Sequence, residues 1–171
     1  MKTYLLLGSN LGNREQNLLL AKNFIINNIG EIMAESDIYE TEPWKMHNEN
    51  KWFLNQVVLV ETQFLPNDIL EKIKKYEKLS GRKSLPDKKS YDNRVIDIDI
   101  LFYENQIINT KQLIIPHPLL HTRRFVLVPL NDIAPEFIHP VMDKSIQELL
   151  KDCKDKSKIK EYYSIEIETT N

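Results

Sequence analysis

The sequence predicts an α+β fold, in which the strands of one antiparallel sheet alternate with helices packed on it. Three observations lead to this prediction. Apolar, β-branched runs of strand length recur along the chain, two segments carry apolar residues at helical spacing, and polar loops without any internal repeat separate them. The length of 171 residues corresponds to one domain, residues 1–171, with a single core.

The first strand and helix follow from sharp changes in composition. Residues 3–8 form a short apolar run, and the turn-forming cluster at 8–13 ends that strand and offers a cap for a helix. Apolar residues then recur at helical spacing from Leu18 to Ile29, and Gly30 marks the stop.

Two further strands and a second helix come next. Strand-like residues cover 32–39 and, more strongly, 53–62. The polar loop between them, residues 41–51, is too long for a hairpin turn. Pro66 begins the second helix, and the Ser-Gly pair at 80–81 ends it.

A second long polar loop, residues 82–93, leads to a strand at 94–103. The resulting order, β-α-β-β-α-β, is that of the ferredoxin-like core, an antiparallel sheet with two helices on one face. Later elements are short: strands at 107–108 and 113–115, helices near 129–133 and 145–150, and an edge strand or a mobile tail at 158–168.

The strand at 94–103 carries the most informative pattern, two carboxylates inside an apolar run. Side chains alternate along a strand, so Asp97 and Asp99 share one face, whereas the isoleucines around them and Phe102 are expected on the other. With Cα atoms about 7 Å apart, the ionised groups repel each other and lose solvation. A cation would remove this cost, and Mg²⁺ binds one or two protein carboxylates together with substrate phosphates. The alternative is an edge strand whose polar face meets water.

Cationic side chains surround these aspartates in the sequence. Arg94 precedes them, Arg82 lies in the loop before, and His117 and Arg123 follow. Because the guanidinium fork binds phosphate oxygens in pairs, the combination favours a polyphosphate bridged by metal. The lysines of residues 82–93 are equally well explained as solvated loop residues.

Two other ligand motifs are incomplete. His117 and His121 have the spacing of zinc ligands on a helical turn, but Pro118 and the lack of a third ligand argue against zinc. A rigid donor to phosphate or a base is the better reading of His117. Gly8-Ser9-Asn10 follows a strand as a phosphate loop would, yet the G-x-x-x-x-G-K-[ST] motif is missing.

Aromatic side chains lie in or beside the loops, and an amide lies inside an apolar strand. Asn55 must find hydrogen-bond partners there, and a planar heterocycle with amide-like edges would supply them while stacking on an aromatic ring. Core packing is the alternative for the aromatics, which are Trp44, Trp52, Phe53 and Phe125.

Composition narrows the class of protein. The 23 Lys and Arg against 25 Asp and Glu leave a net charge of -2, which argues against nucleic-acid and membrane partners. Cys153 is the single cysteine and cannot form an internal disulfide, and no apolar run reaches the length of a signal-peptide core or membrane span. We therefore expect a soluble, cytoplasmic protein.

Together these blocks resemble the 6-hydroxymethyl-7,8-dihydropterin pyrophosphokinase family, folate-pathway enzymes that move a pyrophosphoryl group from ATP to a pterin alcohol. The resemblance covers residues 2–150 and leaves 151–171 as a C-terminal extension. It rests on ordered blocks at 7–12, 39–43, 53–55, 77 with 81–82, 94–100, 115–118, 123–125 and 133–136.

The resemblance implies a role for each candidate residue. Asp97 and Asp99 would bind two Mg²⁺ ions and, with Arg94 and Arg82, form the catalytic set. The residues expected to bind ATP are Glu77, Arg82, Arg94, His117 and Arg123. Those expected to line the pterin pocket are Thr41, Pro43, Trp44, Phe53, Asn55 and Phe125. A monomer acting on ATP and 6-hydroxymethyl-7,8-dihydropterin is implied.

The chain also departs from the family pattern. Residues 90–94 read Ser-Tyr-Asp-Asn-Arg where the family commonly reads R-W-G-P-R, and Ser84 replaces a second basic residue after Arg82. Lys74 and Gln112 stand where the family often has glutamine and arginine, so neither is expected to bind nucleotide.

In the implied reaction the pterin hydroxymethyl oxygen attacks the β-phosphorus of ATP and releases AMP. Alignment and charge neutralisation dominate such a transfer, and the loops at 41–51 and 82–93 are expected to close and exclude water. A nucleotidyltransferase is one alternative, although its Gly-Ser turn would lie much closer to the acids. A ferredoxin-like module that binds a ligand without turnover is another.

Overall fold

The computed structural model describes residues 1–43, 51–81 and 94–163 and has an α+β fold, as predicted. Its elements are β1 (Lys2–Ser9), α1 (Arg14–Asn28), β2 (Gly30–Glu35), β3 (Tyr39–Thr41), β4 (Phe53–Thr62), α2 (Pro66–Leu79), β5 (Asp97–Tyr103), β6 (Ile108–Asn109), β7 (Ile114–Ile115), a 3₁₀ turn (Leu120–Thr122), α3 (Arg124–Ile133), β8 (Ile138–His139), β9 (Lys144–Ser145), α4 (Ile146–Asp152) and β10 (Ile159–Glu161).

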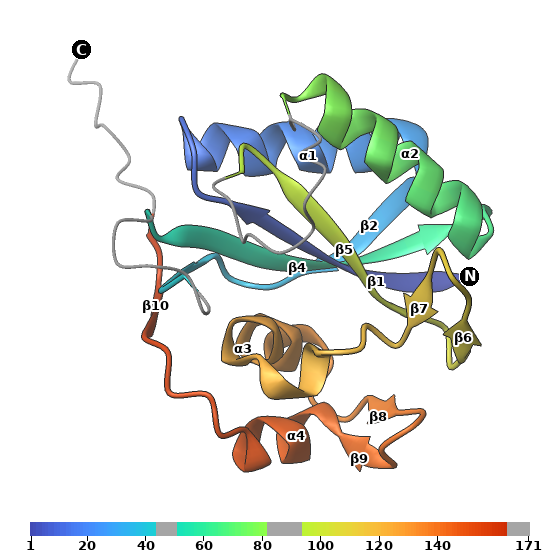
Figure 1. Ribbon diagram of the computed structural model, residues 1–171, viewed down its shortest axis with the longest axis vertical. Coiled ribbons are helices and arrows are strands. Elements are labelled where there is room, and N and C mark those ends of the chain that lie inside the picture. Colours follow the sequence, from blue (N-terminus) through green and yellow to red (C-terminus); the bar gives the residue numbers. More distant parts are fainter. Residues whose placement is uncertain (44–50, 82–93, 164–171) are drawn as a thin grey trace.

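One antiparallel sheet forms the centre of the molecule (Figure 1). Its strand order is β10-β3-β4-β1-β5, and β2 also pairs with β4. Together with α1 and α2 on one face, this order is the ferredoxin-like arrangement. The predicted core is therefore confirmed, and β10 confirms an edge strand within the described part of residues 158–168.

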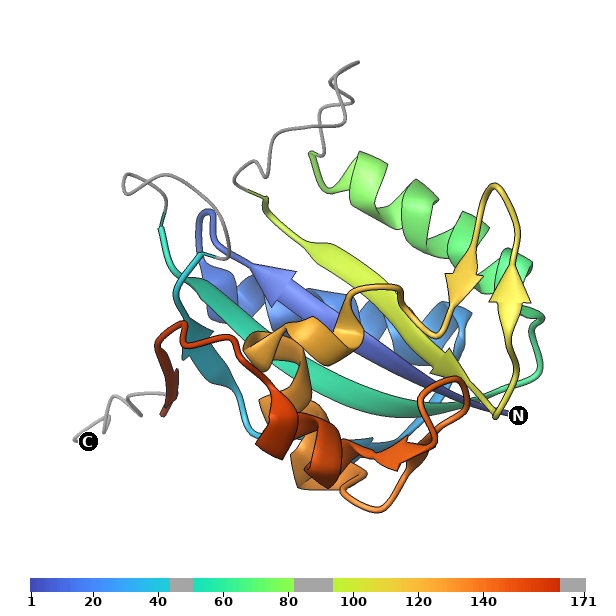
Figure 2. The ribbon, with the colours of Figure 1, turned by 60° about the horizontal axis from the view of Figure 1, so that its bottom comes forward.

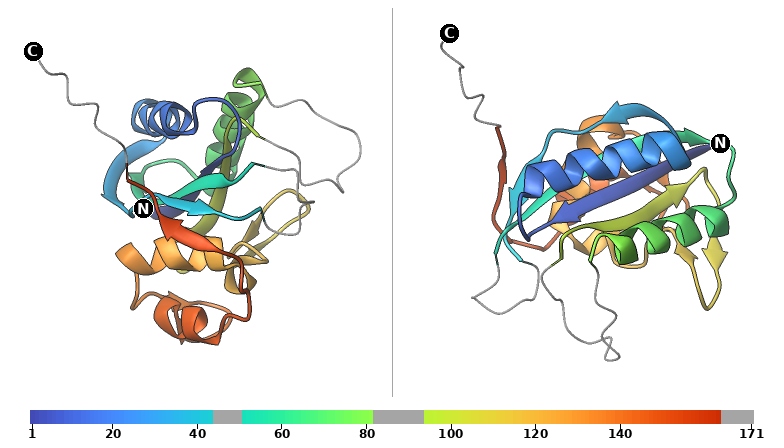
Figure 3. Two further views of the ribbon diagram at one scale, coloured as in Figure 1. Left: turned by 90° about the vertical axis from the view of Figure 1, so that its left-hand side faces the viewer. Right: turned by 90° about the horizontal axis from the view of Figure 1, so that it is seen from above.

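Helices cover both faces of the sheet, α1 and α2 on one and α3 and α4 on the other (Figures 1 and 3). Leu18 and Ile69 bring the first pair of helices into one apolar cluster, and Val126 and Ile146 bring the second pair into another. A fully buried Leu or Ile contributes about 1.5–3 kcal/mol. In Figure 2 the β8–β9 hairpin lies next to α4, whereas the β6–β7 hairpin lies next to α2, where Leu113 and Ile115 join the cluster that α1 and α2 cover.

Local signals account for most helix boundaries. The Asn13 side chain accepts a hydrogen bond from Gln16 N at 3.0 Å and caps α1, and a capping box at Ser145 begins α4. The expected helix near 129–133 begins earlier, at Arg124, so Pro129 lies inside α3 rather than at its start. Proline is common in a first turn, which made that position misleading.

The strand-like stretch at 32–39 is two strands rather than one. Ser36 interrupts it, because its backbone N–H donates to Val57 O at 2.9 Å while its hydroxyl accepts from Val57 N at 3.0 Å. The side chain thus replaces a backbone acceptor, and the chain turns from β2 into β3 along the same partner, β4.

A β-bulge in β5 corrects the expected place of Phe102. Tyr4 pairs with Phe102, whereas Leu5 pairs with Ile100, so Leu101 is an extra residue in the ladder. The bulge reverses the alternation beyond it. Phe102 consequently packs in the cluster below α3 and α4, on the face that carries the aspartates, instead of with the isoleucines.

Within the described residues, no helix is long and apolar enough to span a bilayer.

Candidate active site

Asp97 and Asp99 lie on the sheet face that α3 covers. Ile98 and Ile100, between and after them, belong to the cluster on the opposite face, so the predicted alternation holds in this part of β5. Asp97 forms an ion pair with Arg94 at 2.5 Å from Nη1 to Oδ2. The structure therefore brings the two acids and Arg94 together.

Asp99 lies close enough to Asp97 for the charge of Asp97 to affect its pKa. Burial raises the pKa of Asp99 to about 7, the charge of Asp97 adds to this rise, and the Arg123 guanidinium opposes it. A carboxylate held at such a pKa is one that a cation would stabilise. Among the described residues no group of three or more His, Cys, Asp or Glu side chains could hold a metal. A carboxylate pair suits Mg²⁺, which takes one or two protein carboxylates besides phosphate and water.

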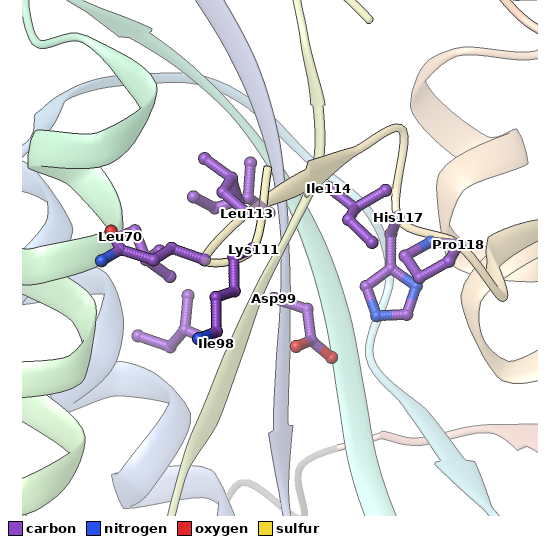
Figure 4. A pocket seen from close by; sticks show the side chains of 10 residues that line it. Leu70, Ile98, Asp99, Lys111, Leu113, Ile114, His117 and Pro118 are labelled. Carbon is purple, nitrogen blue, oxygen red and sulfur yellow. The ribbon is translucent and has the colours of Figure 1, made fainter. Parts of the chain in front are cut away.

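A pocket of about 270 Å³ opens beside Asp99. Ile98 and Leu113 give it apolar walls, and in the close-up Asp99 lies between Lys111 and His117 (Figure 4). Lys111, in the turn between β6 and β7, carried no signal in the sequence. Such a pocket can take a planar, partly apolar group and present its charged end to the carboxylates.

His117 is held as a neutral hydrogen-bond donor. Burial lowers its pKa to about 4, with the Arg123 charge acting in the same direction. Its backbone N–H donates to Leu101 O at 3.0 Å, and its Nδ1 accepts from Leu119 N at 3.3 Å. Because Nδ1 is an acceptor, the ring proton is on Nε2, which is then the atom able to donate to a ligand.

Asn55 and Thr41 form a buried polar pair on the neighbouring strands. The Asn55 Nδ2 atom donates to Thr41 Oγ1 at 2.6 Å, and the two residues are 3% and 2% exposed. Phe53 lies two residues before Asn55 on the same strand, β4, and pairs with Thr41. Three of the residues expected to line a pterin pocket are thus adjacent.

Gly8 lies between the polar pair and the acids, a role that the sequence analysis missed. It pairs with Asn55 on one side and with Asp97 on the other. A Cβ atom at this position would lie 2.9 Å from Asn55 Oδ1. The signal was available, since glycine inside a strand pattern often marks a close approach, but the sequence pattern around Gly8 indicated a turn former and part of an incomplete phosphate loop.

The start of α3 adds a cation and an aromatic ring. Arg123 precedes the helix and is 8% exposed, and its guanidinium carbon lies 5.7 Å from the centre of the Phe125 ring. The charge of Arg123 lowers the pKa of Asp99, so Arg123 lies near the acids. The Phe125 ring lies next to Arg123.

Asn10 is a second residue whose part was missed. Its Nδ2 donates to Lys51 O at 3.1 Å, and its Oδ1 accepts from Arg94 N at 2.6 Å. The backbone N–H of Asn10 also donates to Arg94 O at 3.0 Å. One amide thus connects the start of β4 with the residues that lead into β5.

The remaining candidate residues are Glu77, Pro43, Trp44 and Arg82. Glu77 is buried on α2 and accepts a hydrogen bond from Ile98 N at 2.9 Å, so it holds the edge of β5. Pro43 is half-buried just after β3. Gln112, for which no nucleotide-binding role was expected, lies in the wall of the pocket beside Asp99. Trp44 and Arg82, and most of both loops expected to close, lie outside the described residues.

Comparisons with known proteins agree on one family. The family model described as 7,8-dihydro-6-hydroxymethylpterin-pyrophosphokinase matches residues 4–135. A protein of Aquifex aeolicus named 2-amino-4-hydroxy-6-hydroxymethyldihydropteridine pyrophosphokinase is 42% identical over 145 residues, which cover 85% of this chain and 88% of that relative. The protein of that name from Haemophilus influenzae is 33% identical and covers 92% of this chain and 96% of its own length.

Longer proteins contain the same fold. A crystal structure of a Plasmodium falciparum HPPK-DHPS triple mutant matches with a TM-score of 0.72 at 21% identity, over 88% of this chain and 43% of that one. Identity this low shows the fold alone. The folic acid synthesis protein FOL1 of Dictyostelium discoideum is 43% identical over 146 residues, and this chain spans 20% of its length.

Proposed function

Because the chain belongs to the 7,8-dihydro-6-hydroxymethylpterin-pyrophosphokinase family, we propose that it transfers pyrophosphate from ATP to 6-hydroxymethyl-7,8-dihydropterin in folate biosynthesis. The products are AMP and the pterin diphosphate. We further propose one catalytic domain over residues 1–171 that works as a monomer in the cytoplasm.

One observation carries this proposal, the register across β1. Asn55 and Asp97 pair with the same residue, Gly8, from opposite sides. Their Cα atoms are therefore about two strand spacings, or roughly 10 Å, apart. That distance suits a pterin whose ring edge forms hydrogen bonds with Asn55 and whose alcohol points toward phosphates bound at Asp97 and Asp99.

The pterin pocket in this proposal surrounds Asn55. The Asn55 amide reads the edge of the heterocycle and Phe125 stacks on its face. The full set proposed for pterin binding is Thr41, Pro43, Trp44, Phe53, Asn55 and Phe125.

ATP in this proposal lies along β5. Its base enters the pocket beside Asp99, and the neutral His117 donates from Nε2 to a phosphate or to the nucleoside. Arg94 and Arg123 bind phosphate oxygens, as arginine forks do. Lys111 is a further candidate for the nucleotide. The full set proposed for ATP binding is Glu77, Arg82, Arg94, His117 and Arg123.

Asp97 and Asp99 would hold Mg²⁺, two ions in our proposal. Bound Mg²⁺ would neutralise charge on the triphosphate while the pyrophosphoryl group is transferred. The ion pair between Arg94 and Asp97 supports this assignment, because an arginine released from Asp97 would lie beside the phosphates. The catalytic set is then Asp97, Asp99, Arg94 and Arg82.

In the reaction the pterin hydroxymethyl oxygen forms a bond to the β-phosphorus. The bond between the β-phosphorus and the oxygen that bridges it to the α-phosphorus breaks, and this oxygen leaves with AMP. The alcohol proton is released. The side chains contribute by aligning the two substrates and by excluding water, for which geometry matters more than a strong base.

The test uses ATP labelled separately in the β- and γ-phosphates, incubated with protein, MgCl₂ and 6-hydroxymethyl-7,8-dihydropterin. Both labels are expected on the pterin, in an amount equal to the AMP formed, and only when Mg²⁺ is present. Formation of ADP with transfer of the γ-label alone would refute the proposal. Free pyrophosphate with AMP on an acceptor would favour a nucleotidyltransferase instead.

A further inference from the structure

The C-terminal segment, residues 155–162, lies beyond the part of the chain that the family model matches, which ends at residue 135. It nevertheless contacts the site from outside. After α4 the chain returns to the sheet and forms its edge strand, β10, next to β3 (Figures 1 and 2). The last residue of β3 is Thr41, the hydrogen-bond partner of Asn55.

Backbone hydrogen bonds fix the C-terminal segment along the whole of β3. Ile159 pairs with Thr41, and the bonds continue past both ends of this ladder. Glu42 N donates to Lys158 O at 3.0 Å, and Tyr162 N donates to Ile38 O at 2.8 Å. β3 has only three residues and β4 on its other side, so β10 supplies half of its strand pairing.

An ionic cluster reinforces the contact between these strands. Glu40 of β3 binds Lys160 at 2.7 Å through one carboxylate oxygen and Arg14 at 2.7 Å through the other. Arg14 also donates to Trp52 O at 2.7 Å, just before β4. Burial of the Glu40 carboxylate works against ionisation, but its bonds to Lys160 and Arg14 prevail and lower its pKa. The cluster therefore joins the C-terminal segment to the strands on both sides of residues 44–50.

A second attachment lies at α3. The Asp155 carboxylate accepts from Arg124 N at 2.9 Å, and its other oxygen accepts from Ser157 N at 2.9 Å. This carboxylate satisfies a first-turn N–H of α3 between the two site residues of that turn, Arg123 and Phe125. The same short segment thus holds two elements that carry candidate site residues, β3 and the start of α3.

We propose that the C-terminal segment positions the pterin pocket, with Asp155 and Lys160 as its positioning residues. Neither residue needs to touch substrate. Asp155 sets the first turn of α3 and so the Phe125 ring, and Lys160 holds β3 and so the Thr41 hydroxyl that orients Asn55. This inference rests on the function proposed above, because it assigns those residues to the pterin.

The test compares full-length variants by direct binding and by kinetics. In the Asp155→Ala/Lys160→Ala double variant, we expect the Kd and KM for the pterin to rise about fivefold. The first change removes the carboxylate that accepts from Arg124 N and Ser157 N, and the second removes the ion pair with Glu40. Affinity for MgATP is expected to stay within about twofold. Asp155→Asn with Lys160→Arg keeps an acceptor and a cation and is expected to restore pterin binding. Lys156→Ala, an exposed lysine of the same segment, is the matched control.

Three results would overturn the inference: unchanged pterin affinity in the double variant, equal losses for pterin and MgATP, or no rescue by the conservative pair. Thermal melting of each variant separates these from general loss of folding, which would weaken both ligands alike. The wild-type protein tests the underlying function in the same titration. If it fails to bind the pterin at all, the proposed function fails, whereas wild-type binding with an unaffected variant removes only the inference.

Discussion

The acids of β5 show how a single residue can be unfavourable for the free protein and useful for its chemistry. Asp99 is half-buried beside another carboxylate, and its pKa of about 7 reflects the free-energy cost of ionising it there. A cation and phosphates would convert this cost into binding. Glu77 illustrates the opposite case, since its hydrogen bond to Ile98 N gives it a structural task.

Removal of either acid is expected to abolish most activity without harming the fold. Asp97→Asn and Asp99→Asn each remove a ligand charge, and we expect turnover to fall by about a thousandfold or more. Steady-state AMP formation measures the loss. The melting temperature of each variant without metal is expected to be no lower than that of wild type, and a marked decrease would show that the acids stabilise the fold.

Asn55→Ala is expected to separate the two substrates. The missing amide leaves groups of a bound pterin unsatisfied, at a cost of about 1–3 kcal/mol, whereas MgATP binds elsewhere. Isothermal titration of each ligand alone measures the two affinities. Equal losses for both ligands would remove Asn55 from the pterin pocket.

At the scale of elements, strand pairing rather than loop structure places the candidate side chains. Three adjacent strands, β4, β1 and β5, carry Asn55, Gly8 and Asp97 in one row. Gly8 has no side chain where a Cβ would approach Asn55 Oδ1 to 2.9 Å. The Asn55 amide therefore keeps its position only because residue 8 has no side chain.

Gly8→Ala is accordingly expected to act like Asn55→Ala. The added methyl group displaces the Asn55 amide, and we expect pterin affinity to fall about tenfold or more while MgATP affinity changes little. Binding titrations at matched protein stability measure this. A Gly8→Ala protein that binds the pterin normally would show that the Asn55 amide has room to move.

Most of the elements were predictable because their signals are local. Pro66, the Asn13 cap and the apolar, β-branched residues of β4 act within a few residues. The bulge at Leu101, the division between β2 and β3 and the place of β10 depend on the partner strand, so the pattern of one segment does not contain them. The same holds within the site, where the acids were evident but Asn10 and Lys111 gain meaning only from their neighbours in space.

At the scale of the whole molecule, the two helical layers have different roles, because the candidate site lies on one face of the sheet. The layer of α1 and α2 packs on the uncharged face of the sheet, and the layer of α3 and α4 leaves room for the candidate site at one end. The cost of ionising Asp99 arises at that end. The free protein should therefore show it as a pH dependence of its overall stability.

Stability without metal is expected to fall as the pH rises from about 4 to about 7. The folded-state pKa of Asp99 lies above its unfolded value of 3.8, so its contribution is most favourable below pH 4 and is lost as the pH passes through about 7. Melting temperatures of wild type and Asp99→Asn across this range measure the contribution as a difference. This difference is expected to grow with pH, by about 5 °C at pH 8, and to shrink when MgCl₂ is added. A constant difference would mean that Asp99 titrates normally.

The row through Gly8 has a consequence for which alcohols the enzyme can accept. The strand pairing of the sheet fixes the distance between Asn55 and Asp97, because side-chain changes hardly alter the spacing of neighbouring strands. An acceptor whose arm is one carbon longer would overshoot the phosphorus, and a displacement of about 1 Å can cost about a hundredfold in rate. Changes in the surrounding loops would alter affinity without correcting that overshoot. In the proposed arrangement, substrate choice is therefore tied to the central strands, and engineering a new acceptor would begin at Asn55 and Gly8.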